Sequence, residues 1–509
     1  MYTESIRNAA LLFLIGWLIA GCNTQPKGYM DQRIGLLEVD GSMRFDADIT
    51  LNAQEQELNQ KLVSLRKQMW ETYQAQGFFP PAEPFYYSKE HIEQTTLFKL
   101  LRTMPKGGLQ HLHSSAAVDF RWLIDAASKA EHCYIYWGNP TGSVVKGKLH
   151  FYQPDQVPEG FESTQVVLND TSNRREMLDL LTLREESAQD TVDVWQHFED
   201  IFARIGGFFE YRPIYKTYLR SALDTLAADG IQHTEIRMIF AGGMYDLDHP
   251  AGSGYYTADT TIHVLQELIH EMKQDHPDFT LKFIYTHLRF LSKEVVYTEL
   301  VNAFKYRKKY PELIKGFDLV ANEDDGHSTL YFLDNWEKMD SLSEAYGVDM
   351  PLYLHDGESD WASVQNLYDA YLLDSRRIGH GFNLMHFPEL IEKMKAANIC
   401  IEVSPLSNQI LGYLQDLRLH PANYMLKHGI QCSINSDDPG IFDYNGLSYD
   451  YWSIILAWEL DLKAVKKLVM NSLTYSSLSE KEKTIALKSW QKKWDEFVAQ
   501  GIIMLDHTS

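Results

Sequence analysis

The chain carries a small set of histidines and acidic residues whose types and spacing suit metal binding and proton transfer. His111 and His113 alternate within a strand-like run, so their imidazoles project from the same face of that strand. His355 and Glu358 follow another apolar run, so one can hold a metal ion while the other moves a proton. Three imidazoles and one carboxylate are ligands that Zn²⁺ commonly takes, whereas Mg²⁺ and Ca²⁺ sites need more oxygen atoms. The complete set is His111, His113, His355, Glu358, His380 and Asp437.

His380 and Asp437 belong to this set because each lies at a predicted turn that follows a strand. His380 stands between Gly379 and Gly381, and glycine permits close backbone approach and sharp turns. Asp437 opens an Asp-Asp-Pro segment directly after an apolar run. Taken singly, each residue is more simply interpreted as a hydrogen-bonded buried histidine or a turn-capping aspartate. Their recurrence at the ends of several strands favours one shared site.

The elements that must position these residues form a regular alternation of strands and helices. Helix-like segments such as 258–275 and 293–309 separate the apolar runs from residue 231 onward. Eight such units predict a (β/α)8 TIM barrel, an α/β fold whose active sites form at the carboxyl ends of the strands. The predicted strands are 107–113, 231–239, 279–286, 314–320, 350–355, 377–380, 399–404 and 430–435.

Two additions to the barrel are expected. Residues 22–95 are interpreted as a tether and a helical region, because apolar residues recur at helical spacing over 51–75. Residues 131–165 follow the first strand and contain aromatic residues, glycine and proline, which indicates a non-helical insertion. The barrel itself is assigned to residues 96–500. A further single helix is predicted over 89–103.

The N-terminus has the features of an export signal. Arg7 precedes an apolar run from Ala9 to Ala20, and Cys22 follows directly after a glycine. This run is shorter than the roughly 18 residues that a transmembrane helix needs, so residues 1–21 are predicted to be a cleaved signal peptide. The cysteine resembles that of a bacterial lipobox. Cys22 is therefore the predicted lipidation site of an exported bacterial lipoprotein, in the outer membrane, at the cell surface or in the periplasm; an ordinary cleaved signal is the alternative.

Charge and cysteine content narrow the possible partners. The formal net charge is −23, and the sequence contains no stripe of lysine and arginine residues interleaved with aromatic residues. A nucleic-acid polymer is therefore not expected as a partner, because phosphate contacts require a basic face, although a small nucleoside remains compatible. Cys133, Cys400 and Cys432 show neither zinc-motif spacing nor a disulfide framework, so they are predicted to be buried free thiols.

Several longer stretches occur in a characteristic order. They are Met104-Pro-Lys-Gly-Gly-Leu-Gln-His-Leu-His113, Gly316-Phe-Asp-Leu-Val320, His355-Asp-Gly-Glu358, Arg377-Ile-Gly-His-Gly-Phe382, Ile401-Glu-Val-Ser-Pro-Leu-Ser-Asn408 and Ser433-Ile-Asn-Ser-Asp-Asp-Pro439. Together they resemble the adenosine deaminase family of metallo-dependent hydrolases, most closely its secreted branch, the adenosine deaminase-related growth factors. That branch has an N-terminal helical dimerisation region and an insertion after the first strand. The resemblance therefore implies a homodimer.

The resemblance also implies a role for each candidate residue. One Zn²⁺ per chain would be bound by His111, His113, His355 and Asp437, and the ion would lower the pKa of its water towards about 7. The catalytic residues would be Glu358, His380 and Asp437. Glu358 would protonate N1 of the purine, which requires a raised pKa, and His380 would orient or deprotonate the water. Substrate contacts are implied for Asp438 at N7, the backbone N–H near Ala321 at N3, and Trp195 beside the ribose.

Four positions depart from the family pattern. Asp356 stands where alanine is usual, and Ala321 stands where glycine is common. Ser114 and Ser115 occupy the two positions at which adenosine-specific members carry an aspartate for the ribose hydroxyl groups. Asp356 is expected to point away from the pocket and to pair with a cation such as Arg377.

The residues together with this resemblance imply zinc-dependent hydrolytic deamination of a purine nucleoside, most simply of adenosine or deoxyadenosine, with water, to the corresponding inosine nucleoside and ammonia. One alternative is a zinc hydrolase of the same barrel superfamily that acts on another aminopurine or on an amide. A non-catalytic nucleoside-binding or signalling protein is the other alternative. It is disfavoured because neither Glu358 nor any metal ligand is lost.

Overall fold

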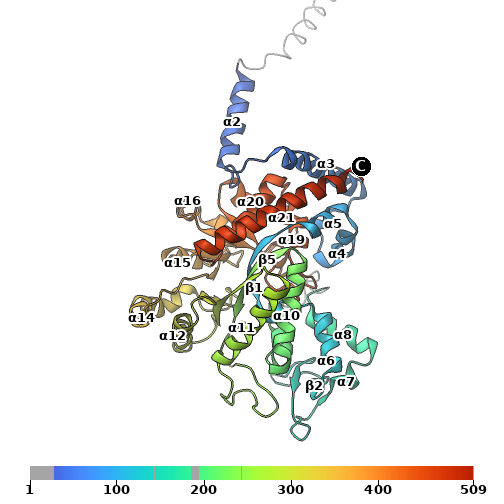
Figure 1. Ribbon diagram of the computed structural model, residues 1–509, viewed down its shortest axis with the longest axis vertical. Coiled ribbons are helices and arrows are strands. Elements are labelled where there is room, and N and C mark those ends of the chain that lie inside the picture. The colour runs from blue at the N-terminus through green and yellow to red at the C-terminus, as the bar shows by residue number, and fades with distance from the viewer. Residues whose placement is uncertain (1–27, 143, 185–193, 242, 508–509) are drawn as a thin grey trace, which may run out of the picture.

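Eight parallel strands form the centre of the molecule (Figure 1). The computed structural model describes residues 28–507 apart from 143, 185–193 and 242. All eight predicted strands are present, and helices alternate with them, which confirms the (β/α)8 barrel. The strands are β1 (Gly107–His113), β5 (Ile231–Met238), β6 (Thr280–Leu288), β7 (Ile314–Val320), β8 (His355–Asp356), β9 (Arg377–His380), β10 (Cys400–Val403) and β11 (Cys432–Ile434).

Two four-stranded sheets, in the orders β1-β5-β6-β7 and β8-β9-β10-β11, meet at two seams. At one seam Phe317 bridges Leu352, and at the other Leu112 bridges Asp437, both in parallel. The ring of strands is therefore closed. β8 is shorter than the predicted strand 350–355, because Pro351 has no backbone N–H to donate to a regular ladder. Its carbonyl oxygen alone takes part in strand pairing, as the acceptor of a hydrogen bond from the backbone N–H of Phe317.

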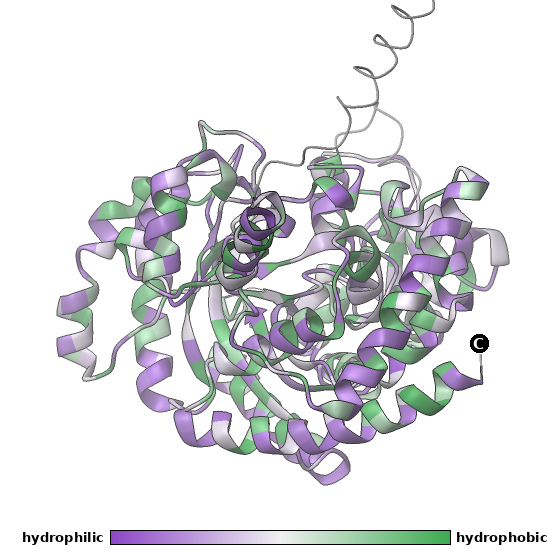
Figure 2. Ribbon diagram, turned by 90° about the horizontal axis from the view of Figure 1, so that it is seen from above, coloured by the Kyte–Doolittle hydropathy of each residue, from purple (hydrophilic) through white to green (hydrophobic). Residues whose placement is uncertain are grey.

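Amphipathic helices surround the strands, with hydrophobic residues concentrated on their inner faces (Figure 2). In α11, for example, Ile262, Leu265, Leu268 and Met272 are buried at helical spacing. The helices of the barrel and the C-terminal region are α10 (Arg212–Ala228), α11 (Ala258–Asp275), α12 (Lys293–Lys309), α13 (Leu333–Trp336), α14 (Met339–Tyr346), α15 (Asn366–Leu372), α16 (Pro388–Ala396), α17 (Pro405–Ile410), α18 (Pro421–Lys427), α19 (Ser448–Ala457), α20 (Leu462–Thr474) and α21 (Glu480–Asp506).

The segment after β1 builds a separate lobe that Figure 1 shows at one end of the molecule. Its three-stranded antiparallel sheet has the order β3-β2-β4. Phe151 of β3 stacks on Tyr211 with ring centroids 3.7 Å apart, and β3 packs on α9, so the lobe holds α9 beside the barrel. The elements of the lobe are α6 (Phe120–Lys129), β2 (Cys133–Tyr136), β3 (Leu149–Phe151), β4 (Phe161–Ser163), α7 (Thr164–Val167), α8 (Thr171–Leu181) and α9 (Val194–Phe209).

Within residues 28–106, four α-helices precede the barrel: α2 (Tyr29–Met43), α3 (Ala53–Gln76), α4 (Phe85–Gln94) and α5 (Thr96–Thr103). Helix α3 packs on α21 and is fixed there by the buried Glu55, which accepts hydrogen bonds from Trp494 at 2.8 Å and Lys466 at 2.6 Å. Helix α2, within the predicted tether, stands away from the body (Figure 1). Among the described helices, none is both long and apolar enough to span a bilayer.

The single helix predicted over 89–103 is in fact broken at Thr95. This residue ends α4 and caps α5, and its hydroxyl accepts a hydrogen bond from the backbone N–H of Phe98 at 3.2 Å. Threonine favours this capping geometry over a helix interior. The free thiols of Cys133, Cys400 and Cys432 are buried, as predicted. Cys22 and the predicted signal peptide lie outside the described residues.

Candidate active site

The carboxyl ends of three strands bring the predicted metal ligands into one cluster. One ligand atom from each of His111, His113, His355 and Asp437 lies within 4.8 Å of the others. Nε2 of His111 and Nε2 of His113 are each 3.2 Å from Oδ1 of Asp437. The Nε2 atoms of His113 and His355 are also 3.2 Å apart. The four donor atoms therefore converge on one point.

Two carboxylates behind the cluster orient the imidazoles of His111 and His355. Oε2 of Glu402 lies 3.0 Å from Nδ1 of His111. Oδ2 of Asp318 lies 2.6 Å from Nδ1 of His355. Each Nδ1 thus carries a proton and donates it to a carboxylate, which leaves the Nε2 lone pair free to bind a metal ion.

Two buried arginines hold these carboxylates in place. Arg237 donates to Asp318 at 2.7 Å and to Glu402 at 2.6 Å, while Arg377 donates to Glu402 and Glu235, each at 2.5 Å. Burial disfavours the ionised form of Glu402, but the charges of Arg237 and Arg377 outweigh it and hold its pKa well below the usual range. Burial raises the pKa of Asp318, and Arg237 opposes that rise.

Glu358 and His380 lie beside the cluster. Nε2 of His380 is 3.6 Å from Oε2 of Glu358 and 3.9 Å from Oδ2 of Asp437. Burial, followed by the negative charges of Asp437 and Glu323, raises the pKa of Glu358 well above its usual range, which favours the protonated carboxyl group. Burial also lowers the pKa of His380 to about 3, so its ring is neutral. A proton donor and a neutral imidazole therefore face the same point.

A chain of hydrogen bonds fixes which nitrogen of His380 carries the proton. The backbone N–H of Ala422 donates to Nδ1 of His420 at 3.1 Å, so the proton of that neutral ring is on Nε2. Nε2 of His420 donates to Oδ1 of Asn408 at 3.1 Å, which turns the amide nitrogen of Asn408 towards Nδ1 of His380 at 3.4 Å. His380 therefore accepts at Nδ1 and presents Nε2–H to the cluster.

Several site residues adopt the left-handed backbone conformation. Ala321, His380 and Asp437 have φ values of 89°, 63° and 63°. Such conformations are costly for residues with a Cβ atom and persist where the surrounding structure imposes them, often at functional sites. A glycine at position 321 would avoid this cost. Gly357 is required beside Glu358, because its φ is 84° and an added Cβ would lie 2.9 Å from atoms of Asn383 and Leu367.

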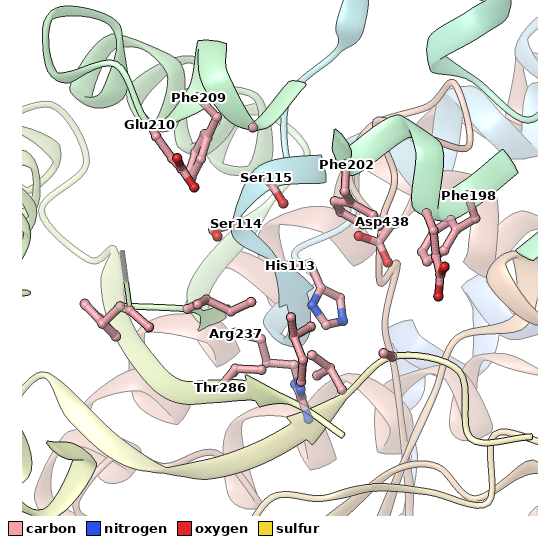
Figure 3. A pocket seen from close by; sticks show the side chains of 18 of the residues that line it. His113, Ser114, Ser115, Phe198, Phe202, Phe209, Glu210, Arg237, Thr286 and Asp438 are labelled. Carbon is pink, nitrogen blue, oxygen red and sulfur yellow. The ribbon is translucent and has the colours of Figure 1, made fainter. Parts of the chain in front are cut away.

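A cavity of about 400 Å³ opens above the cluster. Most of its wall is apolar, with Phe198, Phe202 and Phe209 on α9 (Figure 3). The predicted substrate-contacting residues Asp438, Ala321 and Trp195 all line it, as do His113, His355, Glu358 and Asp437. The structure thus brings together every predicted site residue that it describes, with His111 and His380 buried at the cluster behind the wall.

Asp356 points away from the cavity and pairs with a cation, as expected, but the cation is Arg289 and not the suggested Arg377. Oδ1 of Asp356 accepts a hydrogen bond from the hydroxyl group of Thr329 at 2.6 Å and lies 3.4 Å from the guanidinium group of Arg289. Arg377 is on the adjacent strand, but its guanidinium group is already held by Glu235 and Glu402 inside the barrel. Asp356 therefore connects the strand end that carries His355 to the loop after β7.

Sequence reasoning assigned no role to several residues that support the site. The hydroxyl group of Ser407 donates to Oδ2 of Asp437 at 2.7 Å. The carboxylate of Glu323 accepts from the backbone N–H groups of Gly357 at 3.0 Å and Glu358 at 2.7 Å. The other supporting residues that were given no role are Asp318, Arg237, Glu402, Asn408 and His420. The signal that could have found such residues is a polar side chain within an otherwise apolar run.

The donor atoms fit a bound divalent metal ion. In the described part of the chain, Nε2 of His111 and Oδ1 of Asp437 are buried without a hydrogen-bond partner. Unpaired buried polar atoms cost free energy, so they indicate a missing partner at the point where the ligands converge. Three imidazoles and one carboxylate suit Zn²⁺ and related ions.

Fold and cluster together define a class of protein: a metallo-dependent hydrolase barrel with its site at the carboxyl ends of the strands. Two solved structures share the fold. An adenine deaminase from Arthrobacter aurescens has a TM-score of 0.55 at 20% identity, covering 76% of this chain and 98% of that one. The N6-methyl-AMP deaminase from Arabidopsis thaliana has a TM-score of 0.55 at 14% identity, covering 78% and 99%.

Sequence comparison gives the family. The family model for adenosine deaminase matches residues 172–492, and that for the adenosine/AMP deaminase N-terminal region matches residues 11–101. Adenosine deaminase 2 from Dictyostelium discoideum is 32% identical, over 92% of this chain and 87% of the relative. Adenosine deaminase 2 from Homo sapiens is 31% identical, over 92% and 93%. The chain belongs to the adenosine deaminase family.

Proposed function

We propose that this protein is a zinc-dependent aminohydrolase that converts adenosine or deoxyadenosine, with water, to the corresponding inosine nucleoside and ammonia. One observation carries the proposal: the buried carboxyl group of Glu358, whose raised pKa favours the protonated form, lines the same cavity as the metal-ligand side chains of His113, His355 and Asp437. Hydrolysis of an amidine needs both a proton donor at the ring nitrogen and a nucleophile at the neighbouring carbon. Relatives named adenosine deaminase 2 support the same reaction.

We infer that one Zn²⁺ per chain is held by His111, His113, His355 and Asp437. The unpartnered atoms of this cluster and the orienting carboxylates of Glu402 and Asp318 support this assignment. When bound, Zn²⁺ lowers the pKa of a coordinated water to about 7 and so supplies a nucleophile at neutral pH.

The side chains of the cavity supply the remaining steps. Glu358 donates its proton to N1 of the purine, which makes C6 more electrophilic. The Nε2–H group of His380 donates to the attacking oxygen and stabilises the negative charge that develops there. The C6–N bond then breaks: the proton of the new C6 hydroxyl group passes to the amino group, which leaves as ammonia, and C6 becomes a carbonyl carbon. The proton released by the next water molecule restores the carboxyl group of Glu358.

Two further groups orient the base. Burial, followed by the charge of Asp437, raises the pKa of Asp438 well above its usual range, which favours its protonated form. N7 of a purine is an acceptor, and the protonated carboxyl group of Asp438 donates to it. The backbone N–H of Ala321 donates to N3, and Trp195 lines the cavity at the start of α9.

An absorbance assay on the purified full chain tests the proposal. Adenosine, deoxyadenosine, adenine and AMP are compared, and adenosine or deoxyadenosine is expected to be deaminated with the highest kcat/KM. A chelator-treated sample serves as the control and is expected to regain activity when Zn²⁺ is added. Turnover of another aminopurine or an amide, with none of adenosine or deoxyadenosine, would replace this function by that of another hydrolase of the same superfamily.

We also infer that the protein is exported and anchored to a membrane through a lipid on Cys22. The apolar run that ends at Ala20, with Cys22 two residues later, supports this. Labelling with a radioactive fatty acid is expected to mark the wild type and not a Cys22→Ser variant. Equal labelling of both proteins would contradict the anchor.

A homodimer is the assembly that we infer. Helix α2 supports the homodimer, because it exposes a row of large apolar side chains of the kind that a protein interface buries. These residues are Tyr29, Met30, Ile34, Leu36, Leu37, Val39 and Met43. Sedimentation of the unlipidated Cys22→Ser protein is expected to give twice the mass of one chain. A monomer at all concentrations would contradict the inference.

A further inference from the structure

The end of the cavity that would hold a sugar lacks the acidic residue that is typical of the family after the second histidine. Ser114 and Ser115 stand there instead, and both line the cavity. Their hydroxyl groups form no hydrogen bond with the described residues. C6 and N9 lie at opposite ends of a purine, so a base with C6 at the metal cluster directs its N9 substituent away from that cluster. This wall therefore needs another polar group to bind a sugar.

Glu210 supplies a carboxyl group at this wall. It directly follows α9, which packs on the short helical turn Ser114–Ala116, and Figure 3 shows its side chain in the cavity with those of Phe209, Ser114 and Ser115. The side chain is exposed to the cavity. Its carboxyl group forms neither a hydrogen bond nor an ion pair with the described residues.

The surroundings of Glu210 contain nothing that compensates a negative charge. Desolvation by the surrounding protein raises the pKa of Glu210 to about 7. The hydroxyl group of Tyr215, which also lines the cavity, already donates to the sulfur of Met238 at 3.3 Å. Arg237 is the one arginine or lysine among the described residues of the wall, and its guanidinium group is committed to the buried carboxylates behind the cluster.

We propose that Glu210 is the specificity-determining residue of this cavity: its carboxyl group accepts hydrogen bonds from the sugar hydroxyl groups of a neutral nucleoside and excludes a 5′-phosphate. The inference rests on the proposed function, which places C6 at the metal cluster. Hydroxyl groups are donors that an unpaired carboxylate can bind, and Ser114 and Ser115 add adjacent polar atoms. At a pH above about 7, where Glu210 is ionised, a phosphate would instead meet a like charge with no available cation.

Two substitutions separate hydrogen bonding from charge. Glu210→Ala removes the acceptor, so the dissociation constant of inosine for the zinc-loaded full chain is expected to rise about tenfold or more, as for a lost hydrogen bond to a charged group. Hypoxanthine has no sugar, so its dissociation constant is expected to stay unchanged. Glu210→Gln keeps an acceptor and removes the charge, so kcat/KM for AMP relative to adenosine is expected to rise about tenfold or more.

Glu162→Gln is the matched control, because Glu162 is exposed on β4 and does not line the cavity. It is expected to leave both binding and the AMP-to-adenosine ratio unchanged. If the wild type deaminates adenosine, and neither Glu210 variant differs from it in inosine binding or AMP discrimination, the inference is overturned and the proposed function stands. If the wild type does not act on adenosine or deoxyadenosine, the proposed function is overturned, and the inference with it.

Discussion

Oε2 of Glu402 lies 3.0 Å from Nδ1 of His111, at the base of the metal-ligand cluster. The same carboxylate receives hydrogen bonds from Arg237 and Arg377, so it is held on three sides. A histidine whose Nδ1–H is held in this way presents Nε2 in one orientation and as a stronger ligand. The buried charges of the barrel interior therefore determine the geometry of the metal site.

Glu402→Gln is expected to weaken Zn²⁺ binding by about 10- to 100-fold, because the ring of His111 loses its ionised partner. Competition with a chromophoric chelator measures the affinity directly. Glu389→Gln is the matched control, since Glu389 is highly exposed on α16 and does not line the cavity. Thermal unfolding of the zinc-free proteins separates lost affinity from lost stability. An unchanged Zn²⁺ affinity in folded Glu402→Gln would show that the carboxylate does not support the ligand.

Glu358→Gln is expected to keep its Zn²⁺ and lose most of its activity. The amide has nearly the same shape but cannot transfer a proton to N1, and general acid catalysis contributes about 10²- to 10⁴-fold to rate. Metal content by atomic absorption and kcat for adenosine are measured on the same preparation. A rate near that of the wild type would remove Glu358 from the role of acid.

Asn408→Ala tests whether the proton position of His380 matters. Without the amide that donates to Nδ1, the ring is free to place its proton on either nitrogen, and kcat is expected to fall about tenfold. Zn²⁺ content and KM are expected to stay unchanged, because neither depends on this tautomer. Asn169→Ala, at an exposed position, is the control. A raised KM with unchanged kcat would contradict a role through His380.

The sequence predicted the eight strands because apolar runs of strand length recur along the chain. The carboxyl ends of the strands of a barrel lie at one face, so the polar residues at those ends were predicted to form one cluster. It did not reveal the partners of Glu402 and Asp318, since several buried arginines could pair with either one and only the three-dimensional arrangement selects Arg237 for both. Glu210 could not be found either, because a glutamate after a helix is normally a solvated residue.

The pH dependence of stability provides a test of the buried network at Glu235. Burial disfavours its ionised form, but Arg377 and His233 outweigh this and lower its pKa from 4.5 to about 2. A carboxyl group with a depressed pKa stabilises the fold fully above the unfolded-state pKa, and that stabilisation is lost as pH falls towards the folded-state pKa. The shift corresponds to about 3 kcal/mol of stability at neutral pH.

Zinc-free Glu235→Gln is therefore expected to be less stable than the zinc-free wild type at pH 7. The gap in unfolding free energy should narrow as pH falls from about 4.5 towards about 2, because the wild-type carboxylate then takes up a proton and loses its advantage. Urea unfolding followed by circular dichroism at several pH values measures this gap. Removing the metal matters, because protonation of the histidine ligands would otherwise release Zn²⁺ over the same range. A gap that stays constant from pH 7 down to the acid limit would mean that packing, rather than the charge of Glu235, stabilises this part of the barrel.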